Sequence, residues 1–599
     1  MAEDSDSIRS DPIPIATAQS PGLSDELVHH DSSSSMLSTN SLASDCVPSP
    51  PCASPVSELN SKSDVDEDNA EQHDEISDIE NDNQSQSGLS DNSNPSSDID
   101  EIPMVLPHSI SESTDKYNND LLLLALKLRH KLSAAAVGDL LKLLNYITGT
   151  ECVSRTNYFF DKQFSSVTSG FVFYYLCETC GAYVQDSNSS PKLLCTNELC
   201  KCDVKKQTKK TFFVYLPLKA QLQDLLENHE VDRHLITEGS RVKKNIDNYE
   251  DIVDGELYKA SMPTKDPSTL SLSFNSDGVP VFSSSSCSIW PILCTVNELP
   301  PKLRREHVML AALWFGGSKP IMNSFLKPFV QEICELDEVG FLWTRSGDGT
   351  IIRTKVKALI GICDSVARPV MQGFTQYNGK YGCSYCFDSG VCVAQGDGHT
   401  RAYPYNDNCI PRTKESLANL VERAMTSTHS VLGVKGPSVL SLIPNFDVIE
   451  GLVPDYMHSV LLGVARQLSR LWFDSSNSSC EFYITLAQQR LIDLDLNTIR
   501  PPCNVSRIPR SLSTRKYWKA HEWYMWLLYY SLPILKNYLP TKLCSHLALL
   551  VEGIAILLND SISPESLDHC NLVLSEFVRD FEVLYGLNNV SFNVHLCLH

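Results

Sequence analysis

The chain of 599 residues is long enough for about four domains of roughly 150 residues each, and 42% of its residues are hydrophobic, as in a globular protein. Its formal net charge of −23 is distributed unevenly. Residues 1–115 contain 25 of the 73 acidic residues and two of the 50 basic ones, so the rest of the chain has 48 of each and is neutral. The overall acidity therefore does not exclude nucleic-acid binding, which depends on local basic patches.

Residues 1–110 are rich in Ser, Asp, Asn and Pro and contain no Phe, Trp or Tyr. Such a segment buries too little apolar surface to offset chain entropy, which predicts a disordered acidic tail. The acidic N-terminus lacks the apolar stretch of a signal peptide, and no run of 18 apolar residues predicts a membrane span. Twenty-one cysteines without a secretory signal indicate a reducing compartment, where paired cysteines more often bind metal.

Residues 118–150 contain leucines at helical spacing and predict a small helical segment. The segment is either a packed helical hairpin or a small helix-turn-helix that touches DNA.

Two cysteine pairs predict a zinc-ribbon-like module over residues 165–220. Cys177 and Cys180 form one pair, and Cys195 with Cys200 or Cys202 forms the other. Aromatic, strand-like segments flank both pairs, and four thiolates around one Zn²⁺ make a closed, structural site. The basic run that follows, KCDVKKQTKK, is either a contact to a DNA backbone or a solvated loop.

Residues 265–390 predict the first part of an α/β core with a mixed sheet. We expect strands at LSLSFN, VPVF and CSIWPILCTVN, helices at 306–315 and 321–338, and a further strand at TIIRTKVKALIGICD. Strand, strand, strand, helix, strand is the opening order of a ribonuclease-H-like fold. Asp277 and Asp364 follow the first and last of these strands, which are neighbours in that fold. Paired carboxylates at one sheet edge are a site for Mg²⁺, although each aspartate alone also fits a turn or a helix N-cap.

The core motifs FNSDGVPVFSSSSCSIWPILCTVNELP, LWFGGSKPIMNSFLKPFVQE and LIGICDSVARPVMQGFTQYNGKYGCSYC resemble those of animal CACTA (En/Spm-type) transposases. So do the later motifs GVKGPSVL and VPDYMHSVLLGVARQL. The resemblance runs from about residue 118 to the end. It implies a DDE recombinase related to the V(D)J recombinase, with Asp277 and Asp364 as catalytic carboxylates that hold Mg²⁺ or Mn²⁺. It further implies a nuclear homo-oligomer that hydrolyses a phosphodiester of double-stranded DNA at transposon ends and then transfers the strand.

The resemblance also implies a second structural zinc, shared by Cys383 and Cys386 with His595 and His599. The two histidines are four residues apart, a spacing that places both rings on one face of a helix.

We expect residues 391–590 to form a mostly helical insertion into the core. Residues 591–599 are expected to begin a C-terminal core helix. Within the insertion, Asp455 and His458 resemble a D-x-x-H feature of the family, or form a helix-capping pair. The third family carboxylate, a Glu, would follow His599, so we expect little or no catalytic activity from this chain. A non-enzymatic DNA- or chromatin-binding derivative of a transposase is the alternative.

Overall fold

The computed structural model describes residues 112–599 apart from 131, 165–169, 187–191, 205–210, 236–240, 263–267, 281–286, 397, 503–504 and 506. The predicted acidic tail, residues 1–110, lies outside the described residues. Among the described residues, no helix combines the length and the hydropathy needed to cross a membrane.

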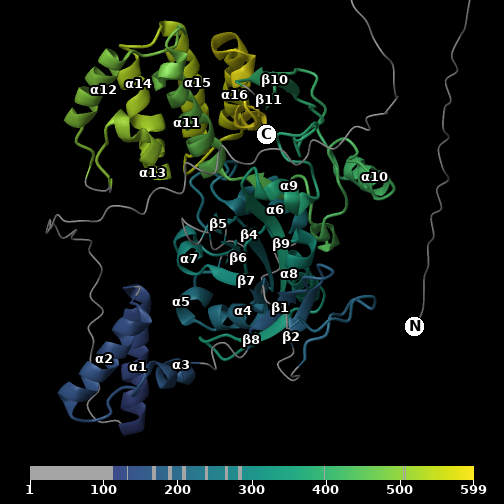
Figure 1. Cartoon of the computed structure of the whole chain (residues 1–599), viewed down its shortest axis with the longest axis vertical. Helices are drawn as coiled ribbons and strands as arrows, with labels where there is room; N and C mark the ends of the chain where they lie inside the picture. The colour runs from purple at the N-terminus through teal and green to yellow at the C-terminus, as the bar shows by residue number, and fades with distance from the viewer. Residues whose placement is uncertain are drawn as a thin grey trace, which may run out of the picture. The chain divides into compact units, whose positions relative to one another are not determined.

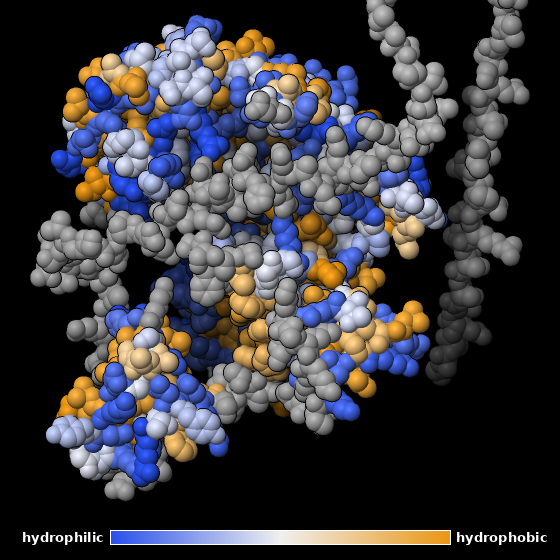
Figure 2. Space-filling model, viewed as in Figure 1, coloured by the Kyte–Doolittle hydropathy of each residue, from blue (hydrophilic) through white to orange (hydrophobic). Residues whose placement is uncertain are grey.

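The chain described begins with three helices, α1 (Glu112–Arg129), α2 (Ala134–Thr148) and α3 (Asn157–Gln163). Ser133 caps α2 by accepting a hydrogen bond from the Ala136 N–H. Their small core consists of Leu123, Val137, Leu141, Val153 and Phe160. Figure 2 shows hydrophobic residues on the surface of this group. Ile147 of α2 is 68% exposed.

A mixed ten-stranded sheet follows, so the predicted α/β fold with a mixed sheet is confirmed (Figure 1). Its main path has the order β12-β9-β4-β6-β7-β3-β1-β2, with β5 on β6 and β8 on β9. Strands β4, β9 and β12 run parallel to one another, and the other pairs are antiparallel. The strands are β1 (Val172–Leu176), β2 (Tyr183–Asp186), β3 (Phe212–Tyr215), β4 (Thr269–Asn275), β5 (Val279–Pro280), β6 (Ser288–Val296), β7 (Met309–Gly316), β8 (Phe341–Thr344), β9 (Ile351–Cys363) and β12 (Leu452–Pro454).

One predicted helix is wrong. A helix is predicted at 306–315, but helix α7 (Pro301–Glu306) ends where that prediction begins, and residues 309–316 form β7. The strand lies between β6 and β3, with most of its side chains buried. A short apolar run of this kind fits a central strand or a buried helix equally well, and long-range pairing decides. Three strands are predicted before helix α8 (Met322–Glu338), at LSLSFN, VPVF and CSIWPILCTVN. The described part of the VPVF segment contains only the two-residue β5, so β7 is the third long strand.

The predicted zinc-ribbon-like segment does not have a sheet of its own. β3 pairs with β7 along four residues, so β1, β2 and β3 extend the central sheet. Stacked and edge-on aromatic rings reinforce this seam, with Phe213 against Tyr174, Tyr183 and Phe325.

Helix α8 packs on the sheet through one apolar face. Phe325, Phe329 and Ile333 are fully buried in the same core as Phe274 of β4. The helices around the sheet are α4 (Leu218–Leu226), α5 (His229–Asp232), α6 (Glu256–Ser261), α7 (Pro301–Glu306), α8 (Met322–Glu338), α9 (Ala367–Gln372) and α10 (Lys414–Met425).

A second, separate core belongs to the helical region after Met457, shown as α11–α16 in Figure 1. The described residues of this region are mostly helical, but the region begins later than residue 391, where the mostly helical insertion is predicted to start. β12, at 452–454, lies inside the predicted insertion yet pairs with β9, and a hairpin of β10 (Val391–Gln395) and β11 (Gly398–Ala402) precedes it. The helices are α11 (Arg466–Phe473), α12 (Leu486–Thr498), α13 (Ala520–Met525), α14 (Ser531–Leu535), α15 (Thr541–Leu557), α16 (Pro564–Tyr585) and α17 (Phe592–His595), with π-helical turns at Met457–Ala465 and Trp526–Tyr530.

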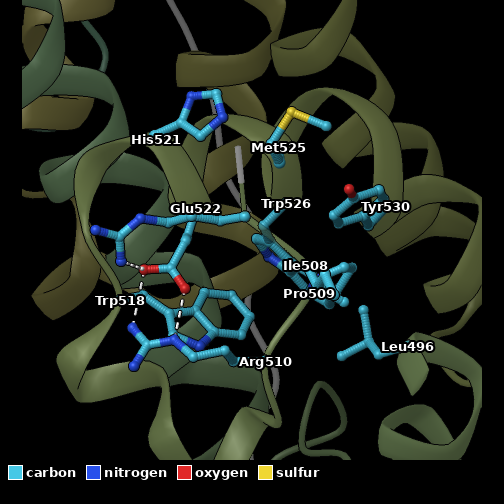
Figure 3. Close-up of a pocket in the computed structure, with 11 residues that line it drawn as sticks. Leu496, Ile508, Pro509, Arg510, Trp518, His521, Glu522, Met525, Trp526 and Tyr530 are labelled. Carbon is cyan, nitrogen blue, oxygen red and sulfur yellow. Dashed lines mark hydrogen bonds and ion pairs between the residues drawn. The ribbon is translucent and has the colours of Figure 1, made fainter. Parts of the chain in front are cut away.

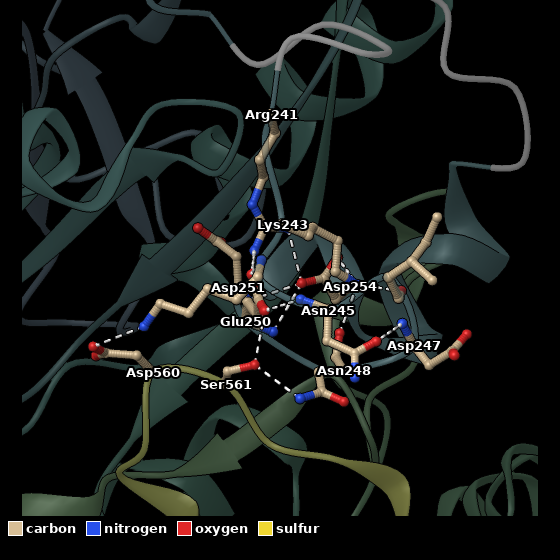
Figure 4. Close-up of polar contacts among 12 residues, drawn as sticks. Arg241, Lys243, Asn245, Asp247, Asn248, Glu250, Asp251, Asp254, Asp560 and Ser561 are labelled. Atoms are coloured by element: carbon tan, nitrogen blue, oxygen red, sulfur yellow. Dashed lines mark hydrogen bonds and ion pairs between the residues drawn. The ribbon is translucent and has the colours of Figure 1, made fainter.

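A polar strap joins the segment before α6 to the loop between α15 and α16 (Figure 4). Tyr249 and Ile562 exchange two backbone hydrogen bonds of 2.8 and 2.9 Å. The Ser561 hydroxyl donates to Glu250 at 2.7 Å and accepts from Asn248 at 2.9 Å. These bonds tie the helical region to the chain that leads into β4.

Candidate active site and metal centres

Three aspartates follow the carboxyl ends of the parallel strands β4, β9 and β12. Asp277 comes two residues after Asn275, which pairs with Ile362, and Asp364 directly follows the last residue of β9. The Asn275 side-chain amide donates to the Ile362 carbonyl at 2.8 Å and fixes this register. Asp455 follows β12, and its backbone N–H donates to the Cys363 carbonyl at 3.1 Å. Since parallel strands end at the same edge, the sequence-predicted Asp277 and Asp364 lie at one edge together with Asp455.

Asp277 and Asp364 also form the local structures that each residue fits by itself, a turn at Asp277 and a helix start at Asp364. Asp277 Oδ1 accepts from the Gly278 N–H at 2.7 Å, and a Cβ at Gly278 would lie 2.6 Å from the Trp290 ring. Asp364 Oδ1 accepts from the backbone N–H groups that open α9. In each case the hydrogen bonds engage one carboxylate oxygen, so the turns position the carboxylates and leave the second oxygen for a cation.

The electrostatics indicate that these groups interact. Burial raises the pKa of Asp277, and the neighbouring charge of Asp364 raises it further. A hydrogen bond to Asp455 raises the pKa of His458 against the effect of burial, and both other aspartates act in the same direction. Repelling carboxylates of this kind are stabilised by a cation between them, and carboxylate oxygens suit Mg²⁺.

Asp455 and His458 form a linked pair at this edge. The His458 Nδ1 lies 2.7 Å from Asp455 Oδ2. Burial alone would raise the pKa of Asp455, but the hydrogen bond from His458 brings it below its ordinary value. The exposed Lys319, from the loop between β7 and α8, is a further neighbour. Burial lowers the pKa of Lys319, and the charge of Asp364 opposes that shift. A lone lysine in a GGSKP loop carries no sequence signal, so sequence reasoning missed it.

Cys383, Cys386, His595 and His599 come together from opposite ends of the second half of the chain. Their ligand atoms all lie within 4.8 Å of one another. Cys386 Sγ is 3.3 Å from His595 Nε2, Cys383 Sγ is 3.6 Å from His599 Nε2, and the two Nε2 atoms are 3.3 Å apart. Ligands of a tetrahedral Zn²⁺ with bonds of ~2.1 and ~2.3 Å are separated by about 3.4–3.8 Å. The donor set therefore fits a zinc ion.

The acid–base behaviour of this cluster agrees with a shared cation. Burial alone would raise the pKa of Cys383, but hydrogen bonds from Cys386, His595 and His599 hold it well below its ordinary range. The pKa of Cys386 is raised, first by its hydrogen bond to Cys383 and then by burial. A thiol whose pKa is held low beside three further donors is an arrangement that a bound cation stabilises.

The thiols of Cys177, Cys180, Cys195 and Cys200 form a second cluster, also within 4.8 Å of one another. Cys180 and Cys195 are 3.4 Å apart at sulfur, and Cys177 and Cys200 are 3.7 Å apart. The Cys202 sulfur is 3.1 Å from that of Cys177, closer than the ~3.8 Å expected between two zinc thiolates. The geometry thus favours Cys200 over Cys202 as the fourth ligand.

A small hollow in the helical region is structural (Figure 3). Its free volume of about 10 Å³ holds at most one water molecule. On one side, the buried Glu522 accepts hydrogen bonds of 2.6 and 2.8 Å from Arg510 and lies 3.5 Å from Arg507. The same carboxylate accepts from the Lys519 N–H at 2.8 Å, so it caps α13 and anchors the preceding segment.

Comparison with known proteins places a family match over the core. Residues 256–416 match the model of transposase family tnp2. The matched stretch includes Asp277, Asp364, Cys383 and Cys386. A search of curated proteins found no match. The family match supports a transposase-derived protein, one that acts on DNA.

Proposed function

We propose that the chain is a DDE transposase of the CACTA type, or a derivative of one, which hydrolyses a DNA phosphodiester and transfers the strand at transposon ends. The observation that carries the proposal is the edge formed by β4, β9 and β12, with Asp277, Asp364 and Asp455 at their carboxyl ends. The tnp2 match covers residues 256–416, which include β4, β9, Asp277 and Asp364, and it supports the proposal. The proposal includes action in the nucleus, on double-stranded DNA, as a homo-oligomer.

The strand order supports a ribonuclease-H-like core. Along the sheet, β7, β6 and β4 are antiparallel neighbours, and β9 and β12 then follow parallel to β4. The ribonuclease-H-like fold implied by the transposase resemblance has this arrangement of three antiparallel and two parallel strands. The parallel strands β4 and β9 bring Asp277 and Asp364 to one edge, although the two residues are 87 positions apart in the sequence.

Each residue of the edge has a role in this proposal. Asp277 and Asp364 would hold Mg²⁺ or Mn²⁺, which when bound activates the attacking oxygen and stabilises the leaving one. Asp455 orients His458 through their hydrogen bond, and the raised pKa of that histidine favours a positive charge beside the DNA phosphate. Lys319 adds a second cation near Asp364. The two cysteine-containing clusters would hold structural zinc ions.

Metal-dependent DNA cleavage tests the proposal. Asp277→Asn and Asp364→Asn are expected to abolish any Mg²⁺-dependent cleavage of a labelled duplex that the unaltered chain shows, a loss of roughly 100-fold or more, because each removes charge stabilisation from the reacting phosphate. Both variants should also lose Mn²⁺ binding, measured by electron paramagnetic resonance, while binding DNA as tightly as the unaltered chain.

Asp348→Asn is the matched control, since Asp348 is an exposed turn residue that accepts from the Thr350 N–H. Full cleavage by the Asp277 and Asp364 variants would overturn the assignment of these carboxylates. If the unaltered chain binds DNA and Mn²⁺ but cleaves nothing, the enzymatic proposal fails and a DNA-binding derivative remains.

A further inference from the structure

A basic recess lies in the helical region, apart from the aspartates and both metal-ligand clusters. It has a volume of about 420 Å³ and is lined by Arg466, Arg470, Asp474, Ser513, Arg515, Lys516 and Trp523. Arg470, Ser513 and Lys516 are exposed, while Trp523 is buried and forms part of the wall. The recess is therefore open to solvent and large enough for a ligand.

The charge of the recess is positive. Four cations line it, and among its lining residues Asp474 is the one carboxylate. Asp474 pairs with Arg515, which also donates to the Leu512 carbonyl at 3.0 Å and lies over the Phe473 ring. The ion pair and these contacts hold Arg515 in place, and the lining residues keep an excess of three positive charges.

The other cations are placed by local structure. Arg466 and Arg470 are four residues apart on α11 and so share one helix face. Lys516 comes from the short helical turn 512–517, where its ammonium lies over the Tyr517 ring. This turn belongs to the stretch 500–519, which has six basic residues and no acidic one.

The recess is connected to the carboxylate edge by a continuous helix. Helical structure runs from Met457 to Phe473, so His458 at the edge and Arg466 and Arg470 at the recess lie on one rod. At 1.5 Å per residue, Arg466 and Arg470 are at most about 12 and 18 Å from His458 along the axis.

We propose that this recess binds backbone phosphates of the DNA duplex whose reacting phosphate is held at the Asp277–Asp364 edge. The proposal rests on the proposed function for the position of the reacting phosphate. Guanidinium and ammonium groups that converge on an open recess are the chemistry that recognises phosphate oxygens, without regard to base sequence. The recess would fix the register of the duplex on the helical region.

The salt dependence of DNA binding tests the site. The full chain and an Arg470→Gln/Lys516→Gln double variant are titrated against fluorescein-labelled duplexes of two unrelated sequences, without added Mg²⁺. Each lost phosphate contact should reduce the slope of log affinity against log salt by about 1, so we expect a reduction of about 2. The loss of affinity should be equal for the two sequences, because phosphates carry no sequence information.

A matched control is Arg490→Gln/Lys536→Gln, which removes two exposed cations of the helical region that do not line the recess. An unchanged slope for the recess variant, or an equal reduction for the control, would overturn the proposal. Ser513→Glu, which adds a carboxylate at an exposed position of the recess, should weaken binding without removing any cation.

Failure of the two proposals can be told apart. Binding is measured without the divalent ion that cleavage needs, so a recess that contributes to binding stands even if the chain cleaves nothing. Conversely, the recess variant could bind DNA like the unaltered chain while Mg²⁺-dependent cleavage still requires Asp277 and Asp364. That result would support the proposed function and reject the recess as a phosphate site.

Discussion

Gly361 is the point at which the three site-bearing strands pack against one another. In β9 it pairs with Phe274 of β4 on one side and Leu452 of β12 on the other. A Cβ at this position would overlap Leu452 and would lie 2.7 Å from the Phe274 ring. We predict that Gly361→Ala lowers the free energy of unfolding by roughly 1–3 kcal/mol, because both neighbours are in a packed core. Urea unfolding followed by tryptophan fluorescence measures the change.

The Gly361 substitution should also disturb the carboxylate edge, since Asp364 lies three residues further along the same strand and turn. Hydrogen exchange is expected to increase in β4 and β9. Gly347→Ala is the control: no atom lies within 4 Å of its added Cβ, so stability should change by less than about 1 kcal/mol. Equal effects of the two substitutions would contradict the packing argument.

The residues of the carboxylate edge differ in how far sequence could identify them. Asp277 and Asp364 were predicted to be neighbours because each follows a strand-like segment and the strand order joins those segments. Asp455 and His458 were noted only as a motif, since their place depends on β12, whose three residues give no periodic signal. Lys319 approaches Asp364 through tertiary packing alone, which local sequence does not encode.

The pair of helices α15 and α16 encloses a buried histidine. His546 stacks on Phe577 with ring centroids 4.4 Å apart, and its Nε2 donates to the Phe577 carbonyl at 2.8 Å. Burial lowers the pKa of His546 from its ordinary value near 6.5. Below that value the unfolded chain binds more protons than the folded chain, so stability contributed by the neutral ring is lost as pH falls.

We predict that His546→Phe makes the stability of the helical region less sensitive to acid. Between pH ~7 and ~5, the urea midpoint of the unaltered chain should fall more steeply than that of the variant. The raised pKa of His458 acts in the opposite direction, but both chains contain it, so the difference isolates His546. His569→Gln, at an exposed residue, should leave the steep slope in place, and parallel curves for His546→Phe would contradict the assignment.

At the level of elements, prediction succeeded where a segment carries its own pattern. The helix at 321–338 is α8 within one residue, because its apolar side chains recur at helical spacing. The eight residues of β7 are mostly apolar, so their spacing does not distinguish a helix from a buried strand, and the predicted helix there is wrong. The union of β3 with β7 was missed because antiparallel pairing between segments nearly 100 residues apart follows from packing of the whole sheet.

At the scale of the whole molecule, one cluster closes the longest loop of the second half of the chain. Cys386 and His595 are 209 residues apart, and the helical region lies between them. Closing a long loop restricts the unfolded chain, which in an entropy model is worth about 4–5 kcal/mol for a loop of 100 residues or more. A zinc at Cys383, Cys386, His595 and His599 would therefore stabilise the helical region and the sheet as one unit.

We predict that His599→Ala removes this zinc and lowers the melting temperature by roughly 5–10 °C, since a loss of a few kcal/mol shifts a large domain by that amount. His599 is the choice because it is exposed, so its removal creates no buried cavity, whereas His595 is buried and stacks on Tyr403. Metal analysis should give one zinc per chain in place of two, and limited proteolysis should cut first around α17. His569→Ala should retain both ions, because it removes an exposed histidine of the same helical region. One bound ion in both the unaltered chain and His599→Ala, with an unchanged melting temperature, would show that the four side chains meet without a metal, and that packing of Phe592 and Leu596 alone holds the C-terminal helix.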